Sequence, residues 1–129
     1  MHSLCRALLI ASVGVLAACA PNQPTVTRAA DTPTYAPTQL VEVLDAPPKR
    51  AYTEIGVIDA PGEPGALRAQ VIAQVRDKAA QLGADAVILQ DVSRTMPASQ
   101  RLNPTTGQYE TTGGLLVPAY KGIAIKYRP

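Results

Sequence analysis

The chain has 129 residues and a net charge of +2, from 12 basic and 10 acidic side chains. This length fits one compact domain. Basic and acidic residues are interleaved along the chain, so the sequence lacks the concentrated basic face that a nucleic-acid-binding protein normally shows. The aromatic residues are five Tyr, with no Trp and no Phe. We therefore expect a small domain with an aliphatic core and no nucleic-acid partner.

The N-terminus has the layout of a secretory signal. Residues 1–6 contain one basic residue, and residues 7–18 form an apolar run that is shorter than the roughly 20 residues of a transmembrane helix. The run ends in Leu16-Ala17-Ala18-Cys19, which resembles the lipobox of bacterial lipoproteins. The resemblance implies that residues 1–18 are a lipoprotein signal peptide and that Cys19 is lipidated. The alternative is an ordinary secretory signal with an incidental cysteine.

Cleavage before Cys19 would leave little reactive chemistry in the mature chain. The only His, His2, and one of the two cysteines, Cys5, lie in the leader, and acylation would consume the thiol of Cys19. The commonest general base and the best nucleophile would then be absent. A Ser or Thr nucleophile with a Lys base, or a carboxylate pair, remains open, but no spacing nominates one. We predict no enzyme activity, no catalytic residues, no cofactor and no metal site.

The lipobox also predicts a location. By resemblance to the lipoprotein class, Cys19 would carry two or three acyl chains, and two or more chains anchor a protein stably to a membrane. In Gram-negative bacteria an Asp directly after the cysteine is the usual signal for retention in the inner membrane, and Ala20 stands there instead. We therefore expect a lipid anchor in the outer membrane and a domain in the periplasm.

Residues 19–37 are expected to be the lipidated cysteine and a Pro-rich tether. The segment mixes four prolines with Thr, Asn, Gln and Ala and has no apolar periodicity, and such segments favour extended polyproline-type backbone. At about 3.1 Å per residue, the tether would reach roughly 55 Å and hold a domain of residues 38–129 clear of the membrane.

The domain begins with two predicted strands, residues 39–44 and 52–58, which are rich in apolar and β-branched residues. Gly56 within the second strand indicates a bulge or a close crossing by another element. A helix is predicted over residues 64–82, with Gly83 as its left-handed C-cap. Its apolar stripe has the three- and four-residue spacing of a buried helix face and consists of Leu67, Val71, Val75, Ala79 and Leu82.

Two further strands complete the predicted domain. Residues 86–89 are a short apolar run, typical of a strand that is buried on both faces. Residues 95–114 are polar and rich in turn residues, which predicts a long flexible hairpin loop, and the last strand is expected over residues 115–127. The order β-β-α-β-β predicts a single α+β domain, with one amphipathic helix packed on a small, mostly antiparallel sheet.

Two runs, residues 52–56 (YTEIG) and 78–88 (KAAQLGADAVI), resemble a group of small bacterial envelope proteins. The group includes uncharacterised lipoproteins and the Rcs-type envelope-stress sensor lipoprotein, whose helix ends in a similar KAxxLGA(N/D)AV run. The resemblance covers residues 50–92 and implies the fold. It also implies one function, stress signalling to an inner-membrane relay. Cytosolic relatives with the same run have been labelled heavy-metal binding, and the sensor's disulfides have no counterpart after Cys19.

Two groups of charged residues could be functional. Asp85 and Asp91 share strand parity, but a metal site made of carboxylates would need more oxygen ligands. We expect Asp85 to cap the turn after the helix and Asp91 to be solvated at the end of its strand. Lys121, Lys126 and Arg128 could contact acidic lipid headgroups or cell-wall polymers, but they are expected to form the solvated face of an edge strand.

The sequence thus favours a non-catalytic, lipid-anchored envelope protein that works through contacts with another envelope protein or the cell wall. One alternative is the stress-sensing lipoprotein that the resemblance implies. Another is a carrier of a small ligand or a metal.

Overall fold

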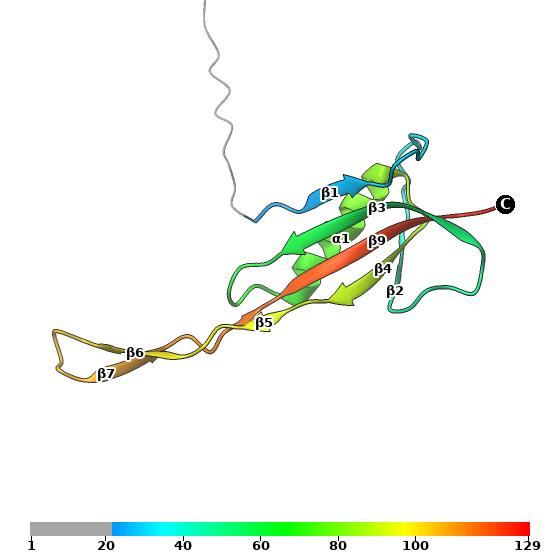
Figure 1. The fold of residues 1–129 in the computed structure, drawn as a ribbon. Coiled ribbons are helices and arrows are strands. Elements are labelled where there is room, and N and C mark those ends of the chain that lie inside the picture. The colour runs from blue at the N-terminus through cyan, green and yellow to red at the C-terminus, as the bar shows by residue number, and fades with distance from the viewer. Residues whose placement is uncertain (1–21) are drawn as a thin grey trace, which may run out of the picture.

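The structure is a computed structural model that describes residues 22–129. It is an α+β fold, with the single helix of the described residues, α1 (Arg68–Leu82), packed behind a five-stranded sheet (Figure 1). The strand order is β1-β3-β9-β4-β2. The strands are β1 (Thr25–Arg28), β2 (Glu42–Leu44), β3 (Tyr52–Pro61), β4 (Ala86–Asp91) and β9 (Ala119–Tyr127).

Four short strands lie outside this sheet, between β4 and β9. They are β5 (Arg94–Thr95), β6 (Ser99–Leu102), β7 (Tyr109–Thr112) and β8 (Leu116–Val117). β5 pairs with β8 and β6 pairs with β7, both antiparallel. We call residues 93–118 the arm, because they form a hairpin that projects from the domain (Figure 1).

The register of the sheet places four strand ends side by side. Thr25 pairs with Asp59, Asp59 with Lys121, and Lys121 with Gln90. The start of β1, the ends of β3 and β4 and the start of β9 therefore lie at one end of the sheet. The arm leaves from this end, which we call the arm end.

Helix α1 ends where the sequence predicts and starts later. Gly83 has the left-handed backbone of a C-cap (φ 81°), as expected. The start at Arg68 replaces the predicted start at residue 64, because Gly65 has a left-handed backbone (φ 79°) and Leu67 is extended. The helix buries Val71, Val75, Ala79 and Leu82, so four of the five predicted stripe residues are confirmed. Leu67 precedes the helix and is 64% exposed.

The main core lies between α1 and the sheet. Ile58, Val75, Val87 and Ala124 are completely buried there. Gly122 on β9 is where the helix comes closest, because a Cβ atom at this position would lie 2.5 Å from Val75 Cγ1 and 2.8 Å from Val87 Cγ2. The absence of a side chain at residue 122 therefore sets the spacing between helix and sheet.

Gly56 marks both features that the sequence suggested. The β3–β9 register shifts between Glu54 and Gly56, as a bulge does. A Cβ atom at Gly56 would also lie 3.1 Å from the Thr27 carbonyl oxygen and 3.2 Å from Leu82 Cδ1. The bulge and the close crossing are both confirmed.

The predicted tether is wrong for much of its length, because residues 25–28 form β1 and pair with β3. The Ala29 N–H extends this pairing to the Ile55 carbonyl (3.1 Å), and Tyr35 packs against the core. Thr38 lies next to the C-terminal end of α1, and its hydroxyl donates a hydrogen bond to the Ala84 carbonyl (2.7 Å). Backbone pairing needs no apolar periodicity, so the pattern of the segment did not reveal it.

The predicted strand arrangement needs three further corrections. The first predicted strand, residues 39–44, is shortened to β2 and runs parallel to β4. The predicted flexible loop, residues 95–114, contains the paired strands β6 and β7. The last strand, β9, is central and not an edge, because β3 and β4 pair with its two sides. The arrangement β-β-α-β-β is therefore too simple, although the α+β class holds.

We predict that Gly122→Ala lowers the free energy of unfolding by about 1–3 kcal/mol, because the added methyl group overpacks the contact with Val75 and Val87. Urea denaturation measures the change. Lys121→Ala is the matched control on the opposite face of β9 and should stay within about 0.5 kcal/mol of the original chain. Equal stability of the two variants would mean that α1 does not pack on β9 at this point.

Candidate functional site

The arm projects from the domain and lies outside its hydrophobic core (Figure 1). Every residue of β6 and β7 is exposed. Its turn is ordered by Asn103, whose side-chain oxygen accepts the N–H groups of Thr105 (2.9 Å) and Thr106 (3.3 Å). Asn103 also donates to Glu110 (2.6 Å). Local polar contacts therefore shape a projection that has no core of its own.

The arm also exposes large apolar side chains. Leu102 and Tyr109 are cross-strand partners next to the turn and are 51% and 72% exposed. Met96 and Leu115 lie closer to the domain and are 40% and 50% exposed. Single exposed apolar residues are common on protein surfaces, but a paired Leu and Tyr at the end of a hairpin form a small apolar surface that is available for contact.

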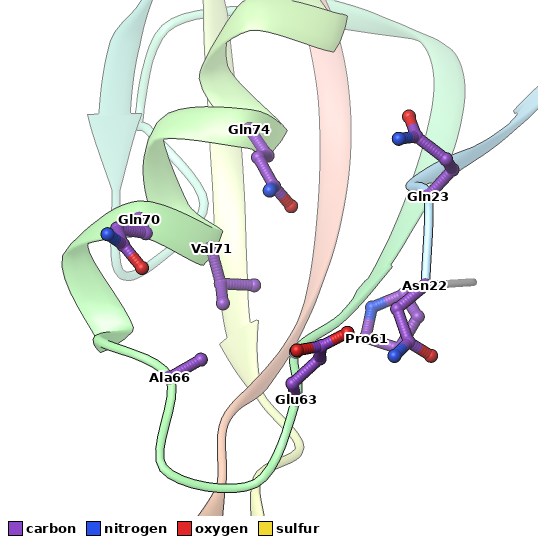
Figure 2. Close-up of a pocket in the computed structure, with 9 residues that line it drawn as sticks. Asn22, Gln23, Pro61, Glu63, Ala66, Gln70, Val71 and Gln74 are labelled. Atoms are coloured by element: carbon purple, nitrogen blue, oxygen red, sulfur yellow. The ribbon is translucent and has the colours of Figure 1, made fainter. Parts of the chain in front are cut away.

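A pocket of about 210 Å³ lies beside the first turns of α1. Gln70 and Gln74 from the helix, Glu63 from the loop before it, and Asn22 and Gln23 from the segment before β1 line it (Figure 2). We call it the carboxamide pocket, because four of these five side chains are amides. Carboxamides both donate and accept hydrogen bonds, so the pocket suits a small polar ligand with hydroxyl or amide groups.

An apolar hollow of about 270 Å³ also lies at the arm end. Thr25, Asp59 and Pro61 line one side of it, and Val92 and Ala119 at the base of the arm line the other. The arm, the carboxamide pocket and this hollow are therefore gathered where β1 begins.

Asp85 lies at the opposite end of β4, and its contacts differ from the prediction. Its Oδ1 accepts a hydrogen bond from Lys126 Nζ (2.7 Å), and its Oδ2 accepts the Tyr127 N–H (3.0 Å). Lys126 Nζ also donates to the Gly83 carbonyl (3.1 Å). Asp85 thus joins the helix end to β9 rather than capping its own turn, and its contacts are those of a structural residue.

The same contacts set the protonation of Asp85. Burial by itself would raise the pKa of Asp85, but the hydrogen bonds from Lys126 and Tyr127 and the charges of Lys126 and Arg50 lower it, and the net pKa lies below its ordinary value. Tyr127 shows the reverse effect, because burial and its hydrogen bond to Glu42 raise the pKa of the phenol. Arg50 lies over the Tyr127 ring, 4.6 Å from its centroid.

Asp91 is solvated at the end of its strand, as predicted. It forms an ion pair with Arg68 (3.0 Å), and its side chain is 43% exposed. It accepts the Ser93 N–H (2.9 Å), and hydrogen bonding from Ser93 together with the Arg68 charge holds the pKa of Asp91 below its ordinary value. Asp85 and Asp91 bind different partners at opposite ends of β4, and residues 22–129 hold no group of three or more metal-ligating side chains.

The three basic residues of the last strand do not form one surface. Lys126 is paired with Asp85, and Arg128 Nε donates to Thr53 Oγ1 (3.1 Å). Lys121 lies in the row that marks the arm end. The prediction of a solvated edge strand is wrong here, because β9 is flanked on both sides.

Cys19 and the signal peptide lie outside the described residues, so the lipidation site stays a prediction. In the part of the chain that the structure covers, no helix has the length and apolar content to cross a bilayer. No protein-family model, curated protein or solved structure matches this chain.

Sequence reasoning predicted a hairpin loop over residues 95–114 but missed its paired strands β6 and β7. It also missed the carboxamide pocket. The alternation of Leu102 and Tyr109 with polar neighbours was a weak strand signal, hidden among turn residues. The pocket had no sequence signal, because its residues come from three separate segments.

We predict that Asp85→Asn lowers the free energy of unfolding at neutral pH by about 1–3 kcal/mol, because Lys126 loses its charged acceptor. A lowered pKa in the folded state adds stability above the ordinary carboxyl range, and this stability is lost as the pH falls through the folded value. The stability of the original chain should therefore fall more steeply in acid than that of the variant. Urea unfolding from about pH 7 to about pH 2 measures both slopes.

Asp59→Asn removes an exposed carboxylate from β3 and serves as the control, with an expected change within about 0.5 kcal/mol at neutral pH. Parallel acid profiles for the original chain and Asp85→Asn would contradict the role assigned to Asp85.

Proposed function

We propose that the protein is a non-catalytic, lipid-anchored envelope protein that acts through contacts with other envelope components. Residues 16–19 support the anchor, since they resemble a lipobox. The proposed location is the outer membrane, with the domain in the periplasm. The observation that carries the proposal of contact is the arm, residues 93–118, an exposed hairpin with an apolar pair beside its turn.

The arm is suited to bind another envelope component, because it is a two-stranded hairpin with exposed apolar side chains. An isolated two-stranded hairpin is at best marginally stable in water, and this one leaves at least half of the surface of Leu102 and of Tyr109 exposed. Binding another envelope component would bury this pair and pair or cover the free strand edges.

The chemistry of residues 22–129 also supports a binding role over catalysis. This part of the sequence has no His and no Cys. Asp85 and Asp91, the two carboxylates considered for a metal site, are held in ion pairs with Lys126 and Arg68.

We predict that a photo-crosslinking amino acid at position 109, placed in the full chain in cells, forms adducts with another envelope component. The same group at Leu40, which is 85% exposed, is the matched control and should give few adducts. Cys19→Ser should release the protein from the membrane fraction, and mass spectrometry of the mature chain should find acyl groups on Cys19. Equal adduct yields at 109 and 40, or an unmodified Cys19, would contradict the proposal.

A small-ligand carrier is the second candidate function, and the carboxamide pocket favours it. The five polar side chains that line it could bind a sugar or an amide-containing ligand. The stress-sensor alternative rests only on the resemblance of residues 52–56 and 78–88.

A carrier predicts that some small sugar, amino acid or dipeptide raises the thermal unfolding midpoint, since a ligand of the native state must stabilise it. Gln74→Ala should abolish the shift. Midpoints that stay flat across such a panel would contradict the carrier function and leave the contact proposal standing.

A further inference from the structure

We propose that the arm contacts the lipid surface that holds the Cys19 anchor, with Leu102 and Tyr109 in the headgroup region. This inference rests on the proposed function, because it takes Cys19 as the lipidated residue. It names the membrane itself as the envelope component that the arm meets.

The first argument is the place where the chain enters the fold. The row Thr25–Asp59–Lys121–Gln90 puts the start of β1 at the end of the sheet from which the arm leaves. The chain therefore enters the sheet at the same end from which the arm leaves, as Figure 1 shows for the start of β1 and the base of the arm.

The second argument is reach. Cys19 and Thr25 are separated by six residue steps, which span at most about 22 Å. β3 has ten residues and extends about 33 Å from the arm end to the opposite end. If the arm end faced away from the membrane, Thr25 would lie farther from the lipid than the chain can bridge. The arm end must therefore face the membrane or lie beside it.

The length of the arm completes the geometry. The segment from Ser93 to the turn at Asn103 contains β5 and β6. Its ten residue steps extend up to about 33 Å, which exceeds the longest span between Cys19 and Thr25. When the arm end faces the membrane, the tip of the arm reaches the lipid surface or the arm lies along it. A tether that extended to residue 37, as the sequence predicts, would let the domain lie in any orientation to the membrane. Because β1 pairs with β3 from Thr25 on, the link between Cys19 and the sheet is short and limits the orientation.

The side chains of the arm suit a lipid interface. Leu102 is apolar, and Tyr109 combines an apolar ring with a polar hydroxyl, as side chains at the membrane interface commonly do. Arg94 and Arg101 are basic and exposed, and the one acidic residue of the arm, Glu110, accepts a hydrogen bond from Asn103. The net positive charge favours anionic headgroups.

The test uses the chain from residue 19 to its end, with a phospholipid coupled to the Cys19 thiol, in vesicles of phosphatidylethanolamine and phosphatidylglycerol. The chain has no Trp, so Tyr109→Trp and Leu40→Trp are single-fluorophore variants at an arm site and at an exposed control site. For Tyr109→Trp we expect blue-shifted indole emission and quenching by brominated lipids at least threefold stronger than for Leu40→Trp. Leu102→Asp, added to Tyr109→Trp, should reduce the quenching of the indole at least twofold.

Equal quenching of the two single-fluorophore variants, with the emission of Tyr109→Trp unchanged from that of the same variant free in solution, would overturn the inference. If photo-crosslinking at position 109 in cells then captures a protein, the contact proposal stands and the arm binds a protein instead of lipid. If native Cys19 carries no acyl group, the proposed function fails. The vesicle experiment still decides whether an anchored arm meets lipid, because the anchor there is synthetic.

Discussion

The position of β9 in the middle of the sheet is the constraint on which the rest of the structure depends. Every residue of β9 has a partner on β3, and every residue of β4 has a partner on β9. Gly122 on β9 lets α1 approach, and Ala124 and Ile125 are completely buried. Without this strand, β3 and β4 would have no common partner and α1 would have no flat surface to cover. The C-terminal strand is therefore the element that closes the fold.

The same pairing gives the domain two different ends. Because β4 and β9 are antiparallel neighbours, the residues between them must leave and return at one place, and they do so as the arm. The other end is fixed by the contacts of Asp85 with Lys126 and Tyr127. The Asp85 contacts thus lie at one end, and the exposed apolar pair, the hollow and the carboxamide pocket lie at or beyond the other.

The difference between the two ends of the domain connects the fold to the proposed function. A chain anchored at Cys19 enters the sheet at the arm end, so a lipid anchor and the arm would act on the same side of the domain. The carboxamide pocket opens near the same end, since Asn22 and Gln23 line it. A domain of this kind would have a defined orientation at a membrane without needing a transmembrane segment.

The sequence by itself predicted the elements whose signals are local. The spacing of Val71, Val75, Ala79 and Leu82 defined the buried face of α1, and Gly83 defined its end, because helix periodicity and left-handed caps are properties of neighbouring residues. The apolar run at the start of β4 and the bulge in β3 were predicted for the same reason. The solvated carboxylate at the end of β4 was assigned correctly as well. The lipobox is also a local motif, and it remains a prediction.

Only the tertiary structure decided which strands are neighbours. The pairing of residues 25–28 with β3, the parallel pairing of β2 with β4 and the central place of β9 all depend on backbone hydrogen bonds between distant segments, which side-chain patterns do not encode. The partners of Asp85 and the lining of the carboxamide pocket also come from segments far apart in the chain. The sequence thus determined the helix and its core face, whereas long-range pairing determined the arm end and everything gathered there.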